Sequence, residues 1–196
     1  LIYQTETIAD FSITEGYLPL RQFIAHQYLK QGIDISANDI IITNGSQQAL
    51  DILSAVLIDE GDKILIEKPS YLAALQVFHL YNPKINSVTL NHHGIDLQEL
   101  TAYLEQKPKF FYAIPTFQNP TGLTYDNETR IALANLLKKT NTIFIEDNPY
   151  GDLRFNDETF LPIYPLLKDQ TILLGTFSIT VSPGMSIGWI ACSNSY

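Results

Sequence analysis

Four polar segments of the sequence each follow an apolar run that is typical of a buried strand. They are residues 44–48 (NGSQQ), 68–71 (KPSY), 115–122 (PTFQNPTG) and 146–150 (EDNPY). In an open α/β sheet, ligands bind beyond the carboxyl ends of the strands, so the residues that follow each strand are the candidates for chemistry. The four segments therefore predict one ligand site at a single edge of a sheet.

The first two segments could hold an anion and a flat ring. Gly45 and Ser46 open a predicted helix, which offers free backbone N–H groups, a hydroxyl and the positive end of a helix dipole to a phosphate. A serine at this point can equally be an ordinary helix N-cap. Tyr71 stands at the start of the next helix, where its ring could cover a flat ligand or pack in the core.

The other two segments could supply an amide and a carboxylate. Asn119 lies in a turn fixed by proline, although Asn-Pro is also a common turn starter. Asp147 ends an apolar run, where a buried carboxylate is costly unless a cation or several donors bind it. The four groups together match pyridoxal phosphate (PLP), which has a phosphate, a flat ring and a ring N–H.

Short apolar runs alternate with helical segments along the chain, as in a largely parallel sheet covered by helices. The runs predict seven strands, at residues 40–43, 63–67, 85–90, 109–114, 142–147, 171–176 and 187–192. Helices are expected at residues 18–30, 46–58, 71–80, 97–106 and 128–139, with Asp96 and Asp126 as N-caps. The last two strands should be antiparallel, because about ten residues between them are too few for a helical crossover. The predicted fold is α/β, a three-layer α/β/α sandwich with a seven-stranded, mostly parallel mixed sheet.

The composition excludes several classes of function. The 196 residues carry a net charge of −9 with 12 basic residues, which argues against nucleic-acid binding. No apolar stretch approaches the roughly 20 residues that span a bilayer, so no membrane partner is expected. The single cysteine, Cys192, is interpreted as a core residue and fits a reducing compartment, so we expect a cytoplasmic protein. The pair His92-His93 is better explained as a polar turn than as metal ligands, and no metal site is predicted.

Five short motifs stand in the order and at the spacing of the class I and II aminotransferases of PLP fold type I. They are residues 45–47 (GSQ), 69–71 (PSY), 119–122 (NPTG), 147–150 (DNPY) and 175–178 (GTFS). The sequence is most similar to the 2-aminoadipate and kynurenine aminotransferase-like branch and to the aminotransferase-like domains of MocR-type regulators. The resemblance extends from about Phe11 to Trp189.

The resemblance implies that one group of residues holds the cofactor phosphate. These residues are Gly45, Ser46 and Gln47, with Thr176 and Ser178 as further hydroxyl donors. In the family the substrates are an amino acid and a keto acid, and two subunits form a homodimer with the cofactor sites at their boundary. A small-molecule substrate of this class and a homodimer are therefore expected.

The resemblance implies that a second group of residues holds the pyridine ring. Tyr71 would stack on the ring, and Asn119 and Tyr150 would bind its phenolic oxygen. Asp147 would pair with the ring nitrogen and keep it protonated, so that the ring can accept electrons.

Three positions depart from the family pattern, and all three would contact the cofactor. Ile179 stands where the family has the Schiff-base lysine, which also moves the substrate proton. Ser186 replaces an arginine that grips the phosphate, and Phe11 replaces a tyrosine that reaches the partner subunit's phosphate. A general base contributes about 10²–10⁴-fold in rate, so transamination should be nearly abolished. PLP binding is expected to be weak and non-covalent, or absent.

We expect residues 1–16 to form an N-terminal segment, residues 17–196 to form the large domain of the fold, and the C-terminal small domain to be absent. Three functions stay open at this point. The first is an aminotransferase-family large domain that is catalytically impaired. The second is a domain of a MocR-type regulator that senses PLP or an amino acid. The third is a working aminotransferase whose parent sequence has lysine and arginine at positions 179 and 186.

Overall fold

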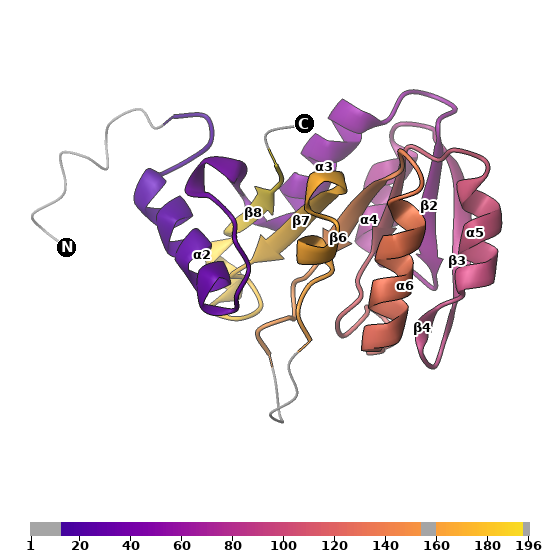
Figure 1. The fold of residues 1–196 in the computed structure, drawn as a ribbon. Coiled ribbons are helices and arrows are strands. Elements are labelled where there is room, and N and C mark those ends of the chain that lie inside the picture. The colour runs from indigo at the N-terminus through magenta and orange to yellow at the C-terminus, as the bar shows by residue number, and fades with distance from the viewer. Residues whose placement is uncertain (1–12, 154–159, 194–196) are drawn as a thin grey trace, which may run out of the picture.

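The computed structural model describes residues 13–153 and 160–193. In this part of the chain one sheet has the strand order β1-β8-β7-β6-β5-β2-β3-β4 (Figure 1). The strands are β1 (Ile40–Thr43), β2 (Lys63–Lys68), β3 (Lys84–Asn91), β4 (Gly94–Ile95), β5 (Phe110–Ala113), β6 (Ile143–Asp147), β7 (Thr171–Thr176) and β8 (Gly188–Ala191). From β7 to β3 all neighbours are parallel, whereas β8 is antiparallel to both β7 and β1.

The seven expected strands are all present, with ends within one residue of those predicted. The antiparallel pairing of the last two strands is confirmed by β7 and β8. The sheet has eight strands instead of seven, because the two-residue β4 turns back and pairs with the end of β3. Two residues are too short to carry a detectable period, so the sequence gives no signal for this strand.

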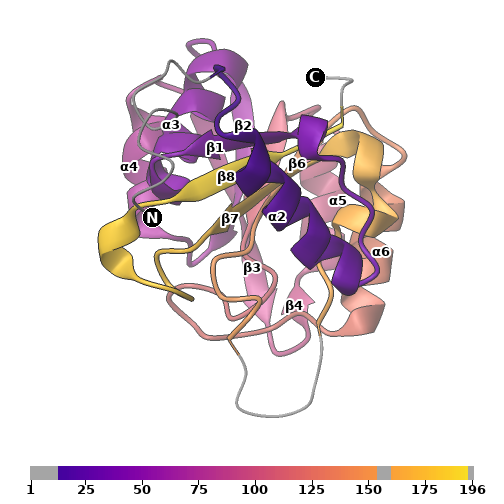
Figure 2. The same ribbon diagram turned by 90° about the vertical axis from the view of Figure 1, so that its left-hand side faces the viewer.

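The described helices cover both faces of the sheet, as the three-layer prediction requires. They are α2 (Leu18–Lys30), α3 (Gly45–Leu57), α4 (Leu72–His79), α5 (Leu97–Leu104) and α6 (Asn127–Leu137), with short 3₁₀ turns at Ala37–Asp39, Tyr164–Leu166, Lys168–Gln170 and Pro183–Met185. Helices α3 and α4 lie on one face, and α2, α5 and α6 lie on the other (Figures 1 and 2). The carboxylates of Asp96 and Asp126 accept backbone N–H bonds in the first turns of α5 and α6, which confirms both N-caps.

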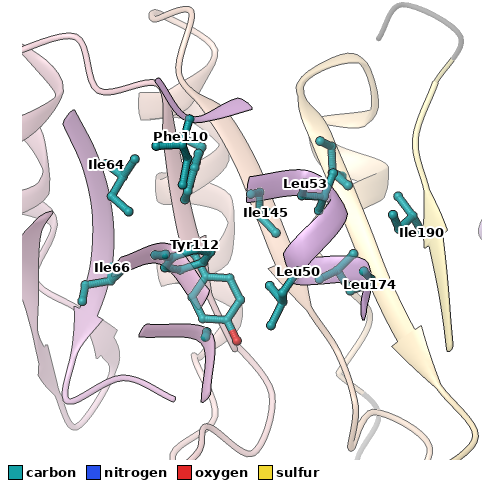
Figure 3. Close-up of a cluster of buried hydrophobic side chains, with 14 of the residues drawn as sticks. Leu50, Leu53, Ile64, Ile66, Phe110, Tyr112, Ile145, Leu174 and Ile190 are labelled. Carbon is teal, nitrogen blue, oxygen red and sulfur yellow. The ribbon is translucent and has the colours of Figure 1, made fainter. Parts of the chain in front are cut away.

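The side chains of β5 show how the sheet separates two apolar layers. Phe110 and Tyr112 point toward α3 and α4 and pack in the cluster that Figure 3 shows. Phe111 and Ala113 point to the opposite face, toward α5 and α6. All four are fully buried, which is why the strand reads as a continuous apolar run. Each large side chain buried in this way contributes about 1.5–3 kcal/mol to the stability of the fold. The sheet therefore holds the loops at its edge in defined positions.

Six strands of the described sheet run in the same direction, and five of them bring the ends that precede the candidate segments to one edge of the sheet. These five strands are β1, β2, β5, β6 and β7. The polar segments singled out in the sequence begin at these ends, so their common placement at one edge is confirmed. The boundary at residue 16 and the lack of a small domain stay predictions.

Candidate functional site

A pocket of about 190 Å³ lies at this edge of the sheet. Seven of the residues predicted to bind the cofactor line it, namely Ser46, Tyr71, Asn119, Asp147, Tyr150, Thr176 and Ser178. Ile114, Pro149 and Ile179 complete the lining. Two of the predicted residues, Gly45 and Gln47, lie outside it. The structure thus brings most of the predicted site together, while the binding of a cofactor by these residues stays a prediction.

The start of α3 forms one wall of the pocket. Gly45 has a φ of +78°, and Asn44, the N-cap, makes no side-chain capping bond. Ser46 therefore lies within the first turn of the helix, and its interpretation as an N-cap is wrong. A first turn without a side-chain cap leaves backbone N–H groups for an anion.

Gln47 does not face the pocket, although the resemblance assigns it to the phosphate. Its amide Nε2 donates to the carbonyl of Ala73 at 3.1 Å, which links α3 to the start of α4. This contact explains why Gln47 is absent from the lining, because the side chain points along the sheet edge toward α4. Its assignment to the phosphate stays a prediction that would need the side chain to turn.

Two segments that line the pocket carry the ring and the amide. Tyr71 is the N-cap residue of α4. It packs against the apolar core and also lines the pocket, so both expectations for this residue, a core residue and a ring that could cover a ligand, are met in part. Burial raises the pKa of Tyr71, and the nearby Asp147 adds to this shift. On the turn after β5, Asn119 Nδ2 donates to the hydroxyl oxygen of Tyr150 at 3.3 Å, so the two groups predicted to bind one ligand oxygen already lie together.

Asp147 is the most unusual group in the pocket. It ends β6 with 2% of its surface exposed, and Oδ2 accepts a hydrogen bond from the hydroxyl of Tyr112 at 2.7 Å. The other oxygen, Oδ1, is buried and has no hydrogen-bond partner among the described residues. Burial raises the pKa of Asp147 to about 6, and the bond from Tyr112 opposes that shift. A buried carboxylate with one free oxygen is suited to a ligand that brings a cationic N–H.

Of the two hydroxyl groups predicted to bind the phosphate at the end of β7 and in the loop that follows, that of Thr176 already makes hydrogen bonds within the protein. Thr176 Oγ1 donates to the carbonyl of Ile187 at 2.9 Å and accepts from the backbone N–H of Ser178. Thr176 thus has no hydroxyl proton left for an anion in this arrangement, although it lines the pocket. Ser178 also lines the pocket, and its hydroxyl has no hydrogen-bond partner within the protein's described ranges.

The two departures in this loop are placed differently. Ile179 lines the pocket beside Ser178. Ser186 is exposed, has a φ of +46°, and lies outside the pocket lining. No lysine of the described residues lines the pocket, and Lys68, the nearest in sequence to Tyr71, is exposed. The third departure, Phe11, lies outside the described residues.

The sequence analysis did not predict the residues that form hydrogen bonds to Asp147 or to the turn that carries Asn119. Tyr112 holds Asp147, and Glu67 and Gln118 hold the turn that carries Asn119. A signal existed for Glu67, because it ends an apolar run as Asp147 does. Tyr112 gave none, since a tyrosine in an aromatic strand reads as core.

Among the described residues, the histidine pair and the helices concern two other kinds of site, a metal site and a membrane span. His93 Nδ1 lies 2.9 Å from Asp126 Oδ2 in the turn after β3, and the described residues contain no cluster that could hold a metal ion. Cys192 is half-buried and packs against the core, as its assignment requires. Within residues 13–153 and 160–193, no helix is both long and apolar enough to span a membrane.

Comparison with known proteins identifies the family. The sequence matches the family model "Aminotransferase class I and II" over residues 2–196. The chain belongs to this aminotransferase family. It is 42% identical over 191 residues to aromatic-amino-acid aminotransferase 1 of Thermococcus litoralis, which covers 93% of this chain and 46% of that protein.

Relatives of this aminotransferase-family chain include regulators as well as enzymes. It is 35% identical to the uncharacterized HTH-type transcriptional regulator YisV of Bacillus subtilis, over 90% of this chain and 37% of that protein. The crystal structure of LysN, the alpha-aminoadipate aminotransferase of Thermus thermophilus, superposes with a TM-score of 0.89 at 34% identity, over 97% of this chain and 50% of LysN. That LysN structure is complexed with N-(5'-phosphopyridoxyl)-L-leucine. The predicted family and fold are therefore confirmed, and the chain spans about half the length of the relatives it matches or less.

Proposed function

We propose that this chain forms a PLP-binding domain of an aminotransferase-family protein, holds the cofactor without a covalent bond, and is impaired in transamination. The observation that carries the proposal is the buried carboxylate oxygen Oδ1 of Asp147, which has no hydrogen-bond partner among the described residues. Asp147 lines the pocket. Leaving a buried acceptor unpaired costs about 1–3 kcal/mol, and a ligand with a cationic ring N–H would remove that cost.

The residues of the pocket fit the parts of PLP. Asp147 would hold a proton on the ring nitrogen, Tyr71 would cover one face of the ring, and Asn119 with Tyr150 would orient the ring oxygen. The phosphate would lie at the start of α3, beside the hydroxyls of Ser46 and Ser178. When bound, PLP supplies an electron sink for reactions at the α-carbon of an amino acid.

The same pocket lacks the groups that would complete catalysis. Ile179 has a hydrocarbon side chain, which can neither attack the cofactor nor move a proton. Ser186 cannot offer the charged, two-pronged contact of an arginine, and the loss of a hydrogen bond to a charged group costs about 1.5–3 kcal/mol, or one to two decades in affinity. We therefore propose weak and reversible binding.

Two measurements on the full chain test the proposed function. Equilibrium dialysis should show saturable binding of PLP, and an assay with an amino acid and a keto acid should show no turnover above a protein-free solution of PLP. Turnover far above that background would overturn the impairment. A lack of saturable binding would overturn the cofactor site.

A sensing domain of a MocR-type regulator is the second candidate, because the chain is 35% identical to the regulator YisV over 90% of its length. In this role an amino acid would bind with PLP and change the affinity of the protein for DNA without release of a keto acid. A DNA-binding domain encoded in the same gene would support this candidate.

The proposal includes a homodimer in the cytoplasm. Three apolar side chains are largely exposed: Val56 in α3 at 74%, Leu72 in α4 at 67%, and Leu80 at the end of α4 at 72%. A second copy of the chain could cover them. Sedimentation velocity at micromolar concentration tests the dimer, and a monomer at all concentrations would contradict it.

A further inference from the structure

The side chain of Gln118 connects the segment that leads to Tyr71 with the turn that carries Asn119. Gln118 is 1% exposed, and its Nε2 donates to the carbonyl of Pro69 at 2.9 Å, two residues before Tyr71. Its Oε1 accepts from the N–H of Thr121 at 3.0 Å and from the hydroxyl of Thr121 at 2.7 Å. One buried amide thus binds the segment after β2 and also Thr121, in its own turn after β5.

Glu67 fixes the orientation of this amide. It is 1% exposed, its Oε2 accepts from Gln118 Nε2 at 3.0 Å, and its Oε1 accepts from the hydroxyl of Tyr125 at 2.6 Å. Because a carboxylate only accepts hydrogen bonds, it obliges Gln118 to present its NH₂ group to Glu67 and Pro69. The amide oxygen must then face Thr121, so the contacts with both segments follow from Glu67.

We infer that Glu67 and Gln118 are positioning residues that hold Tyr71 and Asn119 at the separation a flat, PLP-like ligand requires. The inference rests on the proposed function of the pocket and adds to it two residues that do not line it. Loss of this Glu67–Gln118 clamp would let the segment that carries Tyr71 and the turn that carries Asn119 move independently, and would lower the affinity for the ligand.

The environment of Glu67 makes the clamp sensitive to a second charge. Burial raises the pKa of Glu67 to about 7, while the bonds from Tyr125 and Gln118 oppose this shift and the nearby Asp147 adds to it. No cation forms an ion pair with Glu67 in the described chain. When Glu67 is ionised, a carboxylate at position 118 would therefore repel it, with no cation of the described residues to offset the repulsion.

A charge swap tests the clamp, with PLP affinity measured by equilibrium dialysis and stability by thermal unfolding. In Gln118→Glu two carboxylates face each other, and Pro69 loses its donor, so we expect PLP affinity to fall about tenfold or more. In the double variant Glu67→Gln with Gln118→Glu, the amide and the carboxylate exchange places, and the bonds from Tyr125 and Thr121 can re-form, while Pro69 still lacks its donor. We expect affinity to rise above that of Gln118→Glu without reaching the wild-type value.

Two further variants keep the test decisive. Thr121→Val introduces no charge in this exposed turn and removes the hydroxyl bond to Gln118 together with the bond from the N–H of Leu123. We expect a smaller loss of affinity, about two- to fivefold. Glu146→Gln is the matched control, because Glu146 is also a buried strand-end carboxylate but accepts from the N–H groups of Ile163 and Tyr164, away from the pocket. It should lower stability and leave the affinity of the folded protein unchanged.

The outcomes separate the clamp from the proposed function. If the wild-type chain binds PLP and Gln118→Glu and Thr121→Val bind it equally well, the clamp is wrong and the cofactor site stands. If affinity falls in Gln118→Glu and the swap does not raise it, or Glu146→Gln loses as much, the role is structural only and the inference is also wrong. If the wild-type chain binds no PLP, both are overturned.

Discussion

At the scale of single residues, two side chains define the pocket, a buried carboxylate with one unpaired oxygen and a hydrocarbon side chain that lines the same pocket. Asp147 is buried, holds one hydrogen bond from Tyr112, and leaves an oxygen without a partner. Ile179 stands in the same pocket with no polar atom to offer. In the proposed function, Asp147 would hold a ring nitrogen, and Ile179 could not form a covalent bond with the cofactor.

The substitution Asp147→Asn should make the apoprotein more stable while it weakens the cofactor site. Because the pKa of Asp147 is raised from 3.8 to about 6, ionisation in the folded state carries a penalty of up to roughly 3 kcal/mol above pH 6, which the amide removes. PLP affinity should fall about tenfold or more, since the bond from a charged ring N–H is weakened.

Urea unfolding at about pH 8 and equilibrium dialysis with PLP measure the two effects of Asp147→Asn. The control is Asp152→Asn, an exposed carboxylate on the following loop, which should change neither quantity. Unchanged PLP affinity in Asp147→Asn would remove this residue from the site.

At the scale of elements, the site depends on how closely the start of α3 packs on β8. A Cβ atom on Gly188 would lie 2.5 Å from the carbonyl carbon of Gly45 and 2.8 Å from the backbone nitrogen of Ser46. Backbone atoms cannot yield as side chains do, so only glycine allows this approach. The contact holds the first turn of α3 at the pocket.

The substitution Gly188→Ala should therefore move α3 and cost stability. Overpacking of this kind costs about 1–3 kcal/mol, and PLP affinity should fall with it because Ser46 shifts. Gly184→Ala in the preceding turn is the control, since its nearest contact would be Ser182 Oγ at 3.9 Å. Equal unfolding midpoints in urea for the two variants would contradict this account of the packing.

The sequence was sufficient to predict the elements and the edge at which the site lies, but not the contacts between strands. The runs at 40–43 and 171–176 are continuous and apolar, and their ends match those observed. The bond from Tyr112 to Asp147 depends on the register of β5 on β6, and the commitment of Thr176 to Ile187 depends on the pairing of β7 with β8. Local patterns do not contain such register, so these contacts could not be predicted.

At the scale of the whole molecule, three buried carboxylates should govern the dependence of stability on pH. Burial raises the pKa values of Glu67 and Glu146 to about 7 and that of Asp147 to about 6. Between their ordinary and raised pKa values, the unfolded chain loses these protons while the folded protein keeps them. The free energy of unfolding should therefore fall as pH rises from about 5 to 8.

Thermal unfolding across this range tests the effect of the buried carboxylates. We expect the midpoint to be several degrees higher at about pH 5 than at pH 8. The variant Glu146→Gln should show a flatter dependence because it removes one of the three groups. A midpoint that rises with pH would contradict the assigned burial of these carboxylates.

Reduction with borohydride in the presence of PLP tests most directly whether a lysine of the chain forms a covalent bond with the cofactor. Intact mass after treatment with one equivalent of PLP should show no stoichiometric adduct on the wild-type chain. The variant Ile179→Lys with Ser186→Arg should gain one phosphopyridoxyl group, mapped to position 179. A stoichiometric adduct on a lysine of the wild-type chain would contradict the central claim.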